Sequence, residues 1–149
     1  MLKNFKNLSI AFFMLFVFTS SAYAHCEIPC GIYDDKTRIT LMLEDITTIE
    51  KSMNSIMQLQ SEKTINYNQL IRWIDNKEMH ADKLQDIVWQ YFMTQRIKTD
   101  TPNYDRKISL LHQMLIYGMK CKQTTDLENV AKLRTLVKEF EALYFEMQK

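Results

Sequence analysis

Glycine and proline are almost absent from this chain, which has two of each in 149 residues. Sandwiches, barrels and hairpin-rich sheets need these residues at most corners, so their scarcity argues against those folds. Two glycines also cannot supply the several positions without a side chain that a glycine-rich phosphate loop or a dinucleotide fingerprint requires. The composition is otherwise that of a globular protein, with 46% hydrophobic and 25% charged residues, and the length suits one domain. The sequence therefore predicts an all-α fold of long helices with short connections.

The first 24 residues have the features of a secretory signal peptide. Two lysines give a positive start, an apolar run covers residues 8–18, and Ala22-Tyr23-Ala24 is a small-x-small cleavage site. Because the run is shorter than the roughly 20 residues of a membrane span, we expect cleavage and no stable span afterwards. The mature chain is then a single domain over residues 25–149 that begins at His25.

The charge of the mature chain gives no reason to expect a nucleic-acid partner. Removing the first 24 residues takes away two lysines and no acid, so the formal charge changes from +1 to −1. Nucleic-acid binding usually shows as a strong basic excess. All three cysteines, Cys26, Cys30 and Cys121, remain, an odd number for a compartment in which thiols oxidise. The protein must therefore protect these three thiol groups from oxidation or use them.

The spacing of apolar residues predicts two helices in the first half of the mature chain. The first helix has Asp34 or Asp35 as its N-cap. Its apolar residues follow one another at steps of three and four, which is typical of a helix that packs nearly parallel to a neighbour. These residues form the seam of the helix: Ile39, Met42, Ile46, Ile49, Met53 and Ile56. The second is predicted over residues 66–96, bent where Lys77 and Glu78 interrupt its apolar stripe: Leu70, Ile74, Ala81, Leu84, Val88 and Tyr91.

Two further helices are predicted beyond a break at Pro102. Pro102 suits the first turn of the third helix, with Asp100 or Thr101 as N-cap, and Thr125 and Glu128 are spaced as a capping box for the fourth. Their stripes are Ile108, Leu111, Leu115, Gly118 and Met119, and then Val130, Leu133, Val137, Phe140, Tyr144 and Met147. The aromatic residues Trp73, Trp89, Phe92 and Phe145 are interpreted as core or subunit interface. Four such helices predict an up-and-down four-helix bundle.

The residues most suited to chemistry lie between the cleavage site and the first helix, in the sequence His25-Cys26-Glu27-Ile28-Pro29-Cys30-Gly31-Ile32-Tyr33. Cleavage gives His25 a free α-amine. This amine, the amide nitrogen of Cys26 and the thiolates of Cys26 and Cys30 form a planar donor set that suits Ni(II) or Cu(II), whereas Zn(II) prefers a tetrahedron. The His25 imidazole is left as an axial ligand. The pattern predicts an N-terminal metal-binding hook over residues 25–33, ahead of a bundle over residues 34–149.

Plainer interpretations stay open at this point. Cys26 and Cys30 could form a small disulfide at the start of a structural bundle, since a Cys-x-x-x-Cys pair alone is a weak signal. An exported bundle could also bind nickel or copper without catalysis. His80 and His112 are interpreted as surface or hydrogen-bonded residues rather than ligands, and Cys121 as a buried structural thiol.

The nine residues of the hook resemble the HCxxPCGxY nickel hook that begins mature nickel superoxide dismutases. The resemblance implies a superoxide dismutase that converts superoxide to oxygen and hydrogen peroxide through a Ni(II)/Ni(III) cycle. It also implies a homohexamer with one nickel ion per subunit. The likeness continues through most of the mature chain, at residues 48–53, 72–74, 77–78 and 91–96.

By this resemblance each hook residue has a role. His25 supplies its α-amine and axial imidazole to nickel, Cys26 its thiolate and backbone amide, and Cys30 the second thiolate. Tyr33 would stand over the open face of the metal, and Tyr91 is the match for a second tyrosine that shares this duty. Both tyrosines would limit access to small anions and order water.

The leader distinguishes this chain from family members that carry a short propeptide. We therefore expect export to the periplasm or the cell exterior, and a cytoplasmic enzyme with a cleaved propeptide is the alternative. Partners that orient the axial imidazole are expected, as at most metal sites. Glu44 with Arg38 or Arg72 are the candidates for that role.

Overall fold

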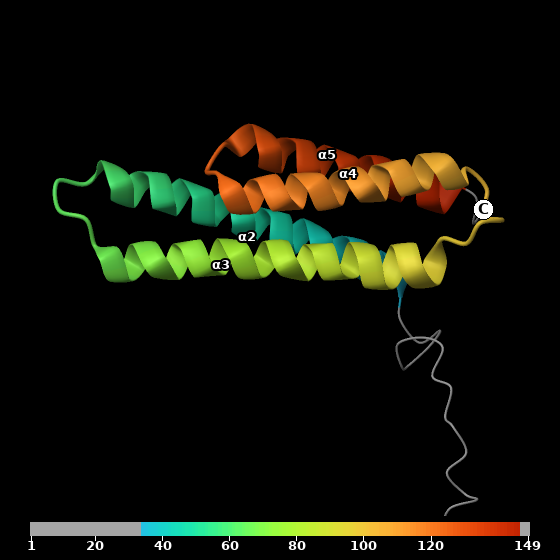
Figure 1. Cartoon of the computed structure of the whole chain (residues 1–149), viewed down its shortest axis with the longest axis horizontal. Coiled ribbons are helices and arrows are strands. Elements are labelled where there is room, and N and C mark those ends of the chain that lie inside the picture. Colours follow the sequence, from blue (N-terminus) through green and yellow to red (C-terminus); the bar gives the residue numbers. More distant parts are fainter. Residues whose placement is uncertain (1–33, 147–149) are drawn as a thin grey trace, which may run out of the picture. The chain divides into compact units, whose positions relative to one another are not determined.

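The structure, a computed structural model, describes residues 34–146, so the leader and the hook lie outside the described residues. The described chain forms four α-helices and one π-helical segment, with no strand: α2 (Asp35–Ser61), α3 (Tyr67–Asp86), η1 (Ile87–Arg96), α4 (Tyr104–Gln123) and α5 (Leu127–Phe145). Successive helices run in alternating directions (Figure 1). The predicted all-α, up-and-down four-helix bundle is confirmed. No helix in this range is long and apolar enough to cross a membrane.

The core follows the predicted seams of α2 and α5. All six seam residues of α2 are at most 2% exposed. The described part of the α5 stripe is also buried: Val130, Leu133, Val137, Phe140 and Tyr144. Phe92 packs edge-on against Phe140 and Tyr144, with ring centroids 5.0 and 5.5 Å apart. Such aromatic pairs contribute about 0.5–1.5 kcal/mol each beyond the area they bury, so this cluster stabilises the end of the bundle where α5 finishes.

The hairpin of α2 and α3 is longer than the hairpin of α4 and α5, and this explains an error in the predicted α3 stripe. Ile74 was expected in the core but is 38% exposed. At 1.5 Å per residue, the 27 residues of α2 span about 40 Å and the 20 residues of α4 about 30 Å. Figure 1 shows that the turn between α2 and α3 extends beyond the other two helices. The first half of α3 therefore lacks a covering helix on one side.

The predicted stripe of α4 was also partly wrong. Met119 is 45% exposed. The predicted positions Leu111 and Gly118 are buried, and the other buried apolar positions are Leu110, Met114 and Cys121, which were not predicted. Because α4 packs against α3, η1 and α5 together, its buried face is broader than one seam and is turned relative to it. Gly118 allows a close approach here, since a Cβ at this position would lie 3.1 Å from Cγ of Gln85.

Two of the four predicted helix starts needed correction, and Asn66 is the N-cap of α3 as its predicted start implies. The N-cap of α2 is Asp34, whose carboxylate accepts from the Lys36 amide at 2.8 Å. At α5 the predicted capping box of Thr125 and Glu128 was wrong, because Asp126 is the N-cap and its carboxylate accepts from the amide of Glu128 at 2.9 Å. In both helices the N-cap carboxylate accepts from the backbone amide two residues later, which has no acceptor within the helix.

The start of α4 lies two residues later than predicted. Pro102 is not in its first turn, and neither Asp100 nor Thr101 caps it. The N-cap is Asn103 in a left-handed conformation with φ 58°, a region that asparagine tolerates better than most residues. The Thr101 hydroxyl is used within the preceding turn, where it accepts from the Lys98 amide at 2.8 Å.

The predicted interruption of the second helix lies in a different place. The α-helix runs through Lys77 and Glu78, and its geometry changes at Ile87, where the π-helical segment η1 begins. The amide of Ile97 donates to the Phe92 carbonyl, five residues earlier, at 2.9 Å. In π geometry residues five apart lie above one another, so η1 presents different neighbours to the bundle from those an α-helix would present.

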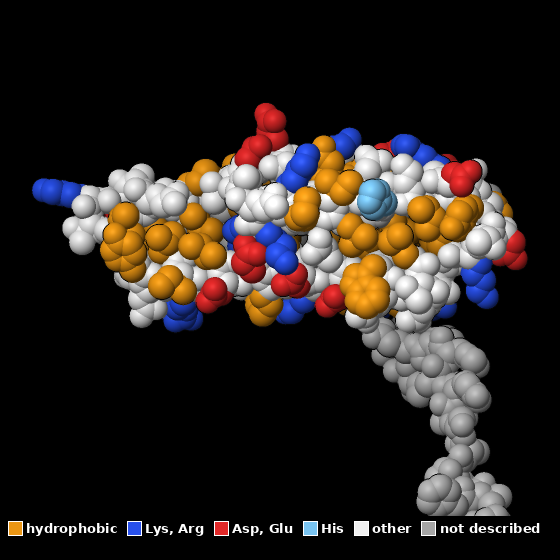
Figure 2. All heavy atoms as spheres, in the orientation of Figure 1, with side chains coloured by type: hydrophobic (Ala, Val, Ile, Leu, Met, Phe, Trp, Pro, Cys, Tyr) orange, Lys and Arg blue, Asp and Glu red, His pale blue; other side chains and the backbone are white. Residues whose placement is uncertain are grey.

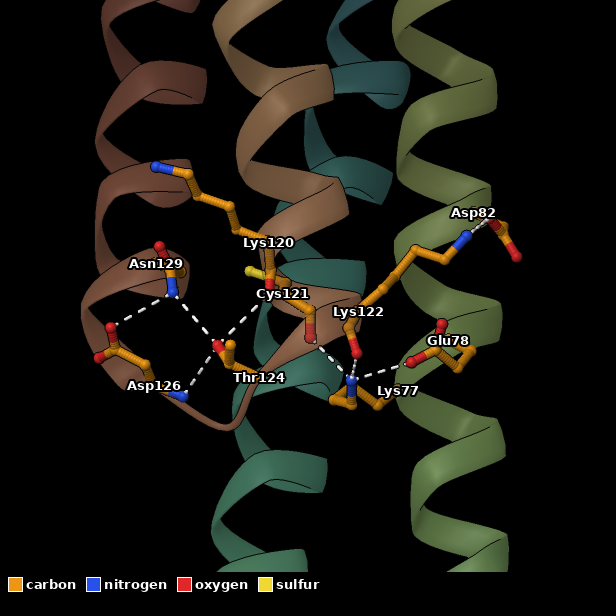
Figure 3. Close-up of polar contacts among 9 residues, drawn as sticks. All are labelled: Lys77, Glu78, Asp82, Lys120, Cys121, Lys122, Thr124, Asp126 and Asn129. Atoms are coloured by element: carbon orange, nitrogen blue, oxygen red, sulfur yellow. Dashed lines mark hydrogen bonds and ion pairs between the residues drawn. The ribbon is translucent and has the colours of Figure 1, made fainter.

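Lys77 is buried rather than exposed, and Figure 3 shows the reason. Its Nζ donates to the backbone carbonyls of Cys121, at 2.8 Å, and Lys122, and forms an ion pair with Glu78 at 2.9 Å. The last carbonyls of a helix have no partners within the helix. A lysine from α3 therefore supplies donors to the carboxyl end of α4.

Candidate functional site

Three side chains from two elements converge on Asp35, the first residue of α2. The hydroxyl of Tyr91, from η1, donates to Oδ1 of Asp35, and the hydroxyl of Tyr144, from α5, donates to Oδ2 at 2.8 Å. The Nε atom of Arg96, also from η1, lies 2.9 Å from Oδ1. We call these four residues the Asp35 cluster. It joins the start of the described chain to two later elements.

Tyr91 is held on several sides. Its side chain is 2% exposed, and Arg96 Nη2 donates to its hydroxyl at 2.7 Å. The guanidinium carbons of Arg38 and Arg96 lie 4.9 and 4.8 Å from the centre of its ring, within the range of cation–π attraction. Burial, followed by the hydrogen bond to Asp35, raises the pKa of Tyr91 above that of a free phenol. The phenol is therefore neutral at physiological pH.

Tyr144 completes the cluster from the other side of the bundle. Burial is the main cause that raises its pKa well above the usual range, and the hydrogen bond to Asp35 acts in the same direction. The ammonium of Lys107, from α4, lies 5.6 Å from the centre of the Tyr144 ring. Lys107 is 3% exposed, and burial lowers its pKa. All four helical elements around this end thus contribute an aromatic or a charged group.

Tyr91 is the one predicted site residue within the described residues; His25, Cys26, Cys30 and Tyr33 lie outside them. Asp35 follows Tyr33 by two positions in the sequence. The hydroxyl of Tyr91 is hydrogen-bonded to Asp35, the first residue of α2.

Sequence reasoning missed the functional neighbours of Tyr91. Asp35 was considered only as a helix cap, Tyr144 only as part of an apolar stripe, and Arg96 only as the end of a helix. A tyrosine at a core position where phenylalanine would fill the same space is the signal that could have drawn attention to Tyr144. A buried hydroxyl needs a partner, and here the partner is Asp35.

His80 is hydrogen-bonded, in agreement with its interpretation, and its partner is a carboxylate 35 positions away. Its Nδ1 lies 2.7 Å from Oδ1 of Asp45, and burial raises the pKa of Asp45, opposed by this hydrogen bond. Arg38 and Glu44 line the same groove as this pair. Arg72 lines another groove, beside Trp73, and Thr48 lines both grooves. His112 is exposed.

The described residues contain no group of three or more histidine, cysteine or acidic side chains that could hold a metal ion. Cys121 is a free, buried thiol, and burial raises its pKa to about 11. A protonated thiol is a poor metal ligand. The predicted donors at His25, Cys26 and Cys30 would comprise an amine, an amide, an imidazole and two thiolates, a mixture of nitrogen and sulfur that fits nickel.

Comparison with known proteins identifies the family. A family described as nickel-containing superoxide dismutase matches residues 20–148. The chain belongs to this family. The match includes residues 25–33 as well as the described bundle, and it confirms the resemblance seen in those nine residues. This nickel superoxide dismutase is thus an oxidoreductase with superoxide as its substrate and nickel as its cofactor. No curated protein and no solved structure matches the chain.

Proposed function

We propose that this enzyme binds one nickel ion per subunit at a processed N-terminus that begins with His25. The observation that carries the proposal is the family match over residues 20–148, because it includes the whole set of donors. His25, Cys26 and Cys30 would hold the ion. When bound, nickel would supply the electron exchange through a Ni(II)/Ni(III) cycle, in which one superoxide is oxidised to oxygen and a second takes up two protons and is reduced to hydrogen peroxide.

The protein side chains control access, orientation and protons. Tyr33 and Tyr91 would limit the site to small anions, and the neutral phenol of Tyr91 keeps a proton at its hydroxyl because its pKa is raised. Arg38 and Arg96 place two positive charges beside the Tyr91 ring.

The bundle also has apolar surface suited to a homohexamer. Tyr67, Ile71 and Ile74 of α3 are 67%, 57% and 38% exposed, and their spacing places them on one face of the helix. Figure 2 shows apolar side chains over this end of the hairpin and along the region between α3 and α4. We propose that copies of the chain cover these side chains in solution. The leader supports export to the periplasm or the cell exterior.

The decisive experiment is a measurement of the N-terminal mass and metal content of the native protein together with its consumption of superoxide. The proposal expects a first residue of His25, one nickel per chain and rapid loss of superoxide. Nickel without superoxide consumption would instead indicate a non-enzymatic metal binder. A mass lower by two hydrogens with no metal would indicate a disulfide between Cys26 and Cys30.

Two variants test the ligands directly. One additional alanine before His25 displaces the α-amine, so activity should be lost while helicity is unchanged. The substitution His25→Gln keeps the amine and removes the axial imidazole, so nickel should still bind while most turnover is lost. Full activity of the extended chain would exclude the amine as a ligand.

A further inference from the structure

We propose that Asp35 is a positioning residue, whose carboxylate accepts a hydrogen bond from Tyr144, forms an ion pair with Arg96 and fixes the hydroxyl of Tyr91, one of the proposed site residues. The inference rests on the proposed function, since it concerns the same site. The inference adds two residues to that site. Asp35 acts through Tyr91, and Tyr144 acts through Asp35.

The hydrogen-bond pattern indicates that Asp35 is more than a helix residue. Its two oxygens accept from two different tyrosines, one in η1 and one in α5, and a guanidinium nitrogen lies 2.9 Å away. The cap of α2 is provided separately by Asp34. Asp35 is therefore not needed as the N-cap, and its carboxylate is directed to side chains of other elements.

The π-helical geometry of η1 is what allows Arg96 to reach the same tyrosine. Arg96 lies five residues after Tyr91, and residues at this spacing share a side of a π-helix. Its Nη2 atom donates to the Tyr91 hydroxyl at 2.7 Å while its Nε atom faces Asp35. The phenol oxygen is thus held between a carboxylate and a guanidinium, which restricts its position more than packing alone would.

The charged and titratable groups around Tyr91 come from every element at this end. Asp35 and Arg38 lie in α2, and Arg96 lies in η1. Tyr144 in α5 bonds to Asp35, and Lys107 in α4 lies over the Tyr144 ring. Of these, Asp35 carries the carboxylate that accepts from the phenol, so its removal should change both the position and the pKa of the Tyr91 hydroxyl.

A double-mutant cycle on the nickel-loaded mature protein tests the proposal. Asp35→Asn keeps the size of the side chain and removes its charge. We expect kcat/KM for superoxide to fall roughly 10-fold, the lower end of what outer partners at metal sites contribute. In a Tyr91→Phe background the same change should alter kcat/KM less than about 2-fold, because a residue that acts through Tyr91 has nothing left to position. Nickel content should stay the same throughout.

The control and a second variant keep the test independent of folding. Asp82→Asn changes an aspartate that pairs with Lys122 at 2.5 Å, away from the cluster, and should leave kcat/KM unchanged. Tyr144→Phe retains the ring and removes one donor to Asp35, so it should lower kcat/KM about 5-fold, the equivalent of one hydrogen bond. Additive effects of Asp35→Asn and Tyr91→Phe, or an unchanged Tyr144→Phe enzyme, would overturn the proposal.

A readout without nickel separates this inference from the proposed function. In the metal-free protein, phenolate absorbance during an alkaline titration reports the pKa of Tyr91 when the Tyr91→Phe variant is subtracted. Asp35→Asn should move this titration to lower pH, because the carboxylate raises the pKa of the phenol. An unmoved titration counts against the role of Asp35. A wild-type protein that binds nickel and consumes no superoxide contradicts the proposed function. The titration still tests the role of Asp35 in that case, because it is measured without nickel.

Discussion

The guanidinium of Arg96 lies 2.7 Å from the phenol oxygen of Tyr91, five residues earlier in the same helical segment. In an α-helix neighbours on one face are three or four residues apart, so this contact depends on the π geometry of η1. The π-helical segment therefore has a defined effect at this site, since it brings a cation onto the hydroxyl of a buried tyrosine.

The first prediction concerns this contact. Arg96→Lys should lower the free energy of unfolding by about 1–2 kcal/mol, because an ammonium cannot reach both Tyr91 and Asp35 as a planar guanidinium does. Urea unfolding followed by circular dichroism measures the change. Arg106→Lys is the matched control: Arg106 forms a surface pair with Glu139 and its side chain is 55% exposed, so we expect a change below about 0.5 kcal/mol. Equal effects of the two substitutions would contradict the prediction.

The second prediction is a pH dependence of stability. Because the pKa of Tyr144 is raised in the folded protein, its contribution to stability is fully present below the unfolded phenol pKa of about 10 and is lost as the pH rises above it. Wild-type stability should therefore decline more steeply above about pH 10 than that of Tyr144→Phe. Unfolding free energies at several pH values test this, and parallel curves for the two proteins would be the contrary result.

The third prediction concerns the lysine that caps α4. Lys77→Met keeps an apolar stem of similar length and removes the donors to the Cys121 and Lys122 carbonyls. We expect a loss of about 2–4 kcal/mol, the range for breaking a buried charged contact. Lys138→Met, at an exposed position of α5, should have little effect. Thermal melting of both variants gives the comparison, and similar melting temperatures would exclude the capping role.

The fourth prediction concerns the reactivity of Cys121. Its pKa of about 11 and its complete burial keep it as a protonated, inaccessible thiol, and the thiolate is the reactive form. In a variant with Cys26→Ser and Cys30→Ser, iodoacetamide near pH 8 should label Cys121 only when urea unfolds the bundle. Intact mass measures the labelling. Rapid labelling of the folded variant would show that this part of the core opens easily.

The fifth prediction separates metal binding from folding. None of the proposed ligands belongs to the hydrophobic core formed by the described residues. Removal of nickel with a chelator should therefore abolish superoxide consumption and leave the helical circular dichroism signal nearly unchanged. A large loss of helicity on nickel removal would mean that the bundle depends on the metal.

The sequence predicted the bundle well where burial follows a simple period. In α2, one apolar seam faces the other helices, and each residue from Ile39 to Ile56 at that spacing is buried. It predicted α4 less well because that helix packs against three elements at once, so its buried face is not one narrow seam. The break at Ile87 had no local marker, since no glycine or proline stands there.

The site was predictable only in part, for a different reason. The hook is a contiguous motif, so its donors can be read from neighbouring positions, and Tyr91 could be matched by resemblance. Asp35 and Tyr144 are 109 positions apart, and Asp45 and His80 are 35 positions apart. Such pairs are set by how helices pack, and the spacing of apolar residues does not contain that information.

The bond between Tyr144 and Asp35 has a consequence for the order of events during synthesis. Asp35 is made 109 residues before its partner, so the last helix must be complete and docked before the beginning of the bundle gains all its bonds. A polypeptide interrupted within α5 before Tyr144 would leave Asp35 without this hydrogen bond. The bonds at the start of α2 are therefore complete only in a finished chain.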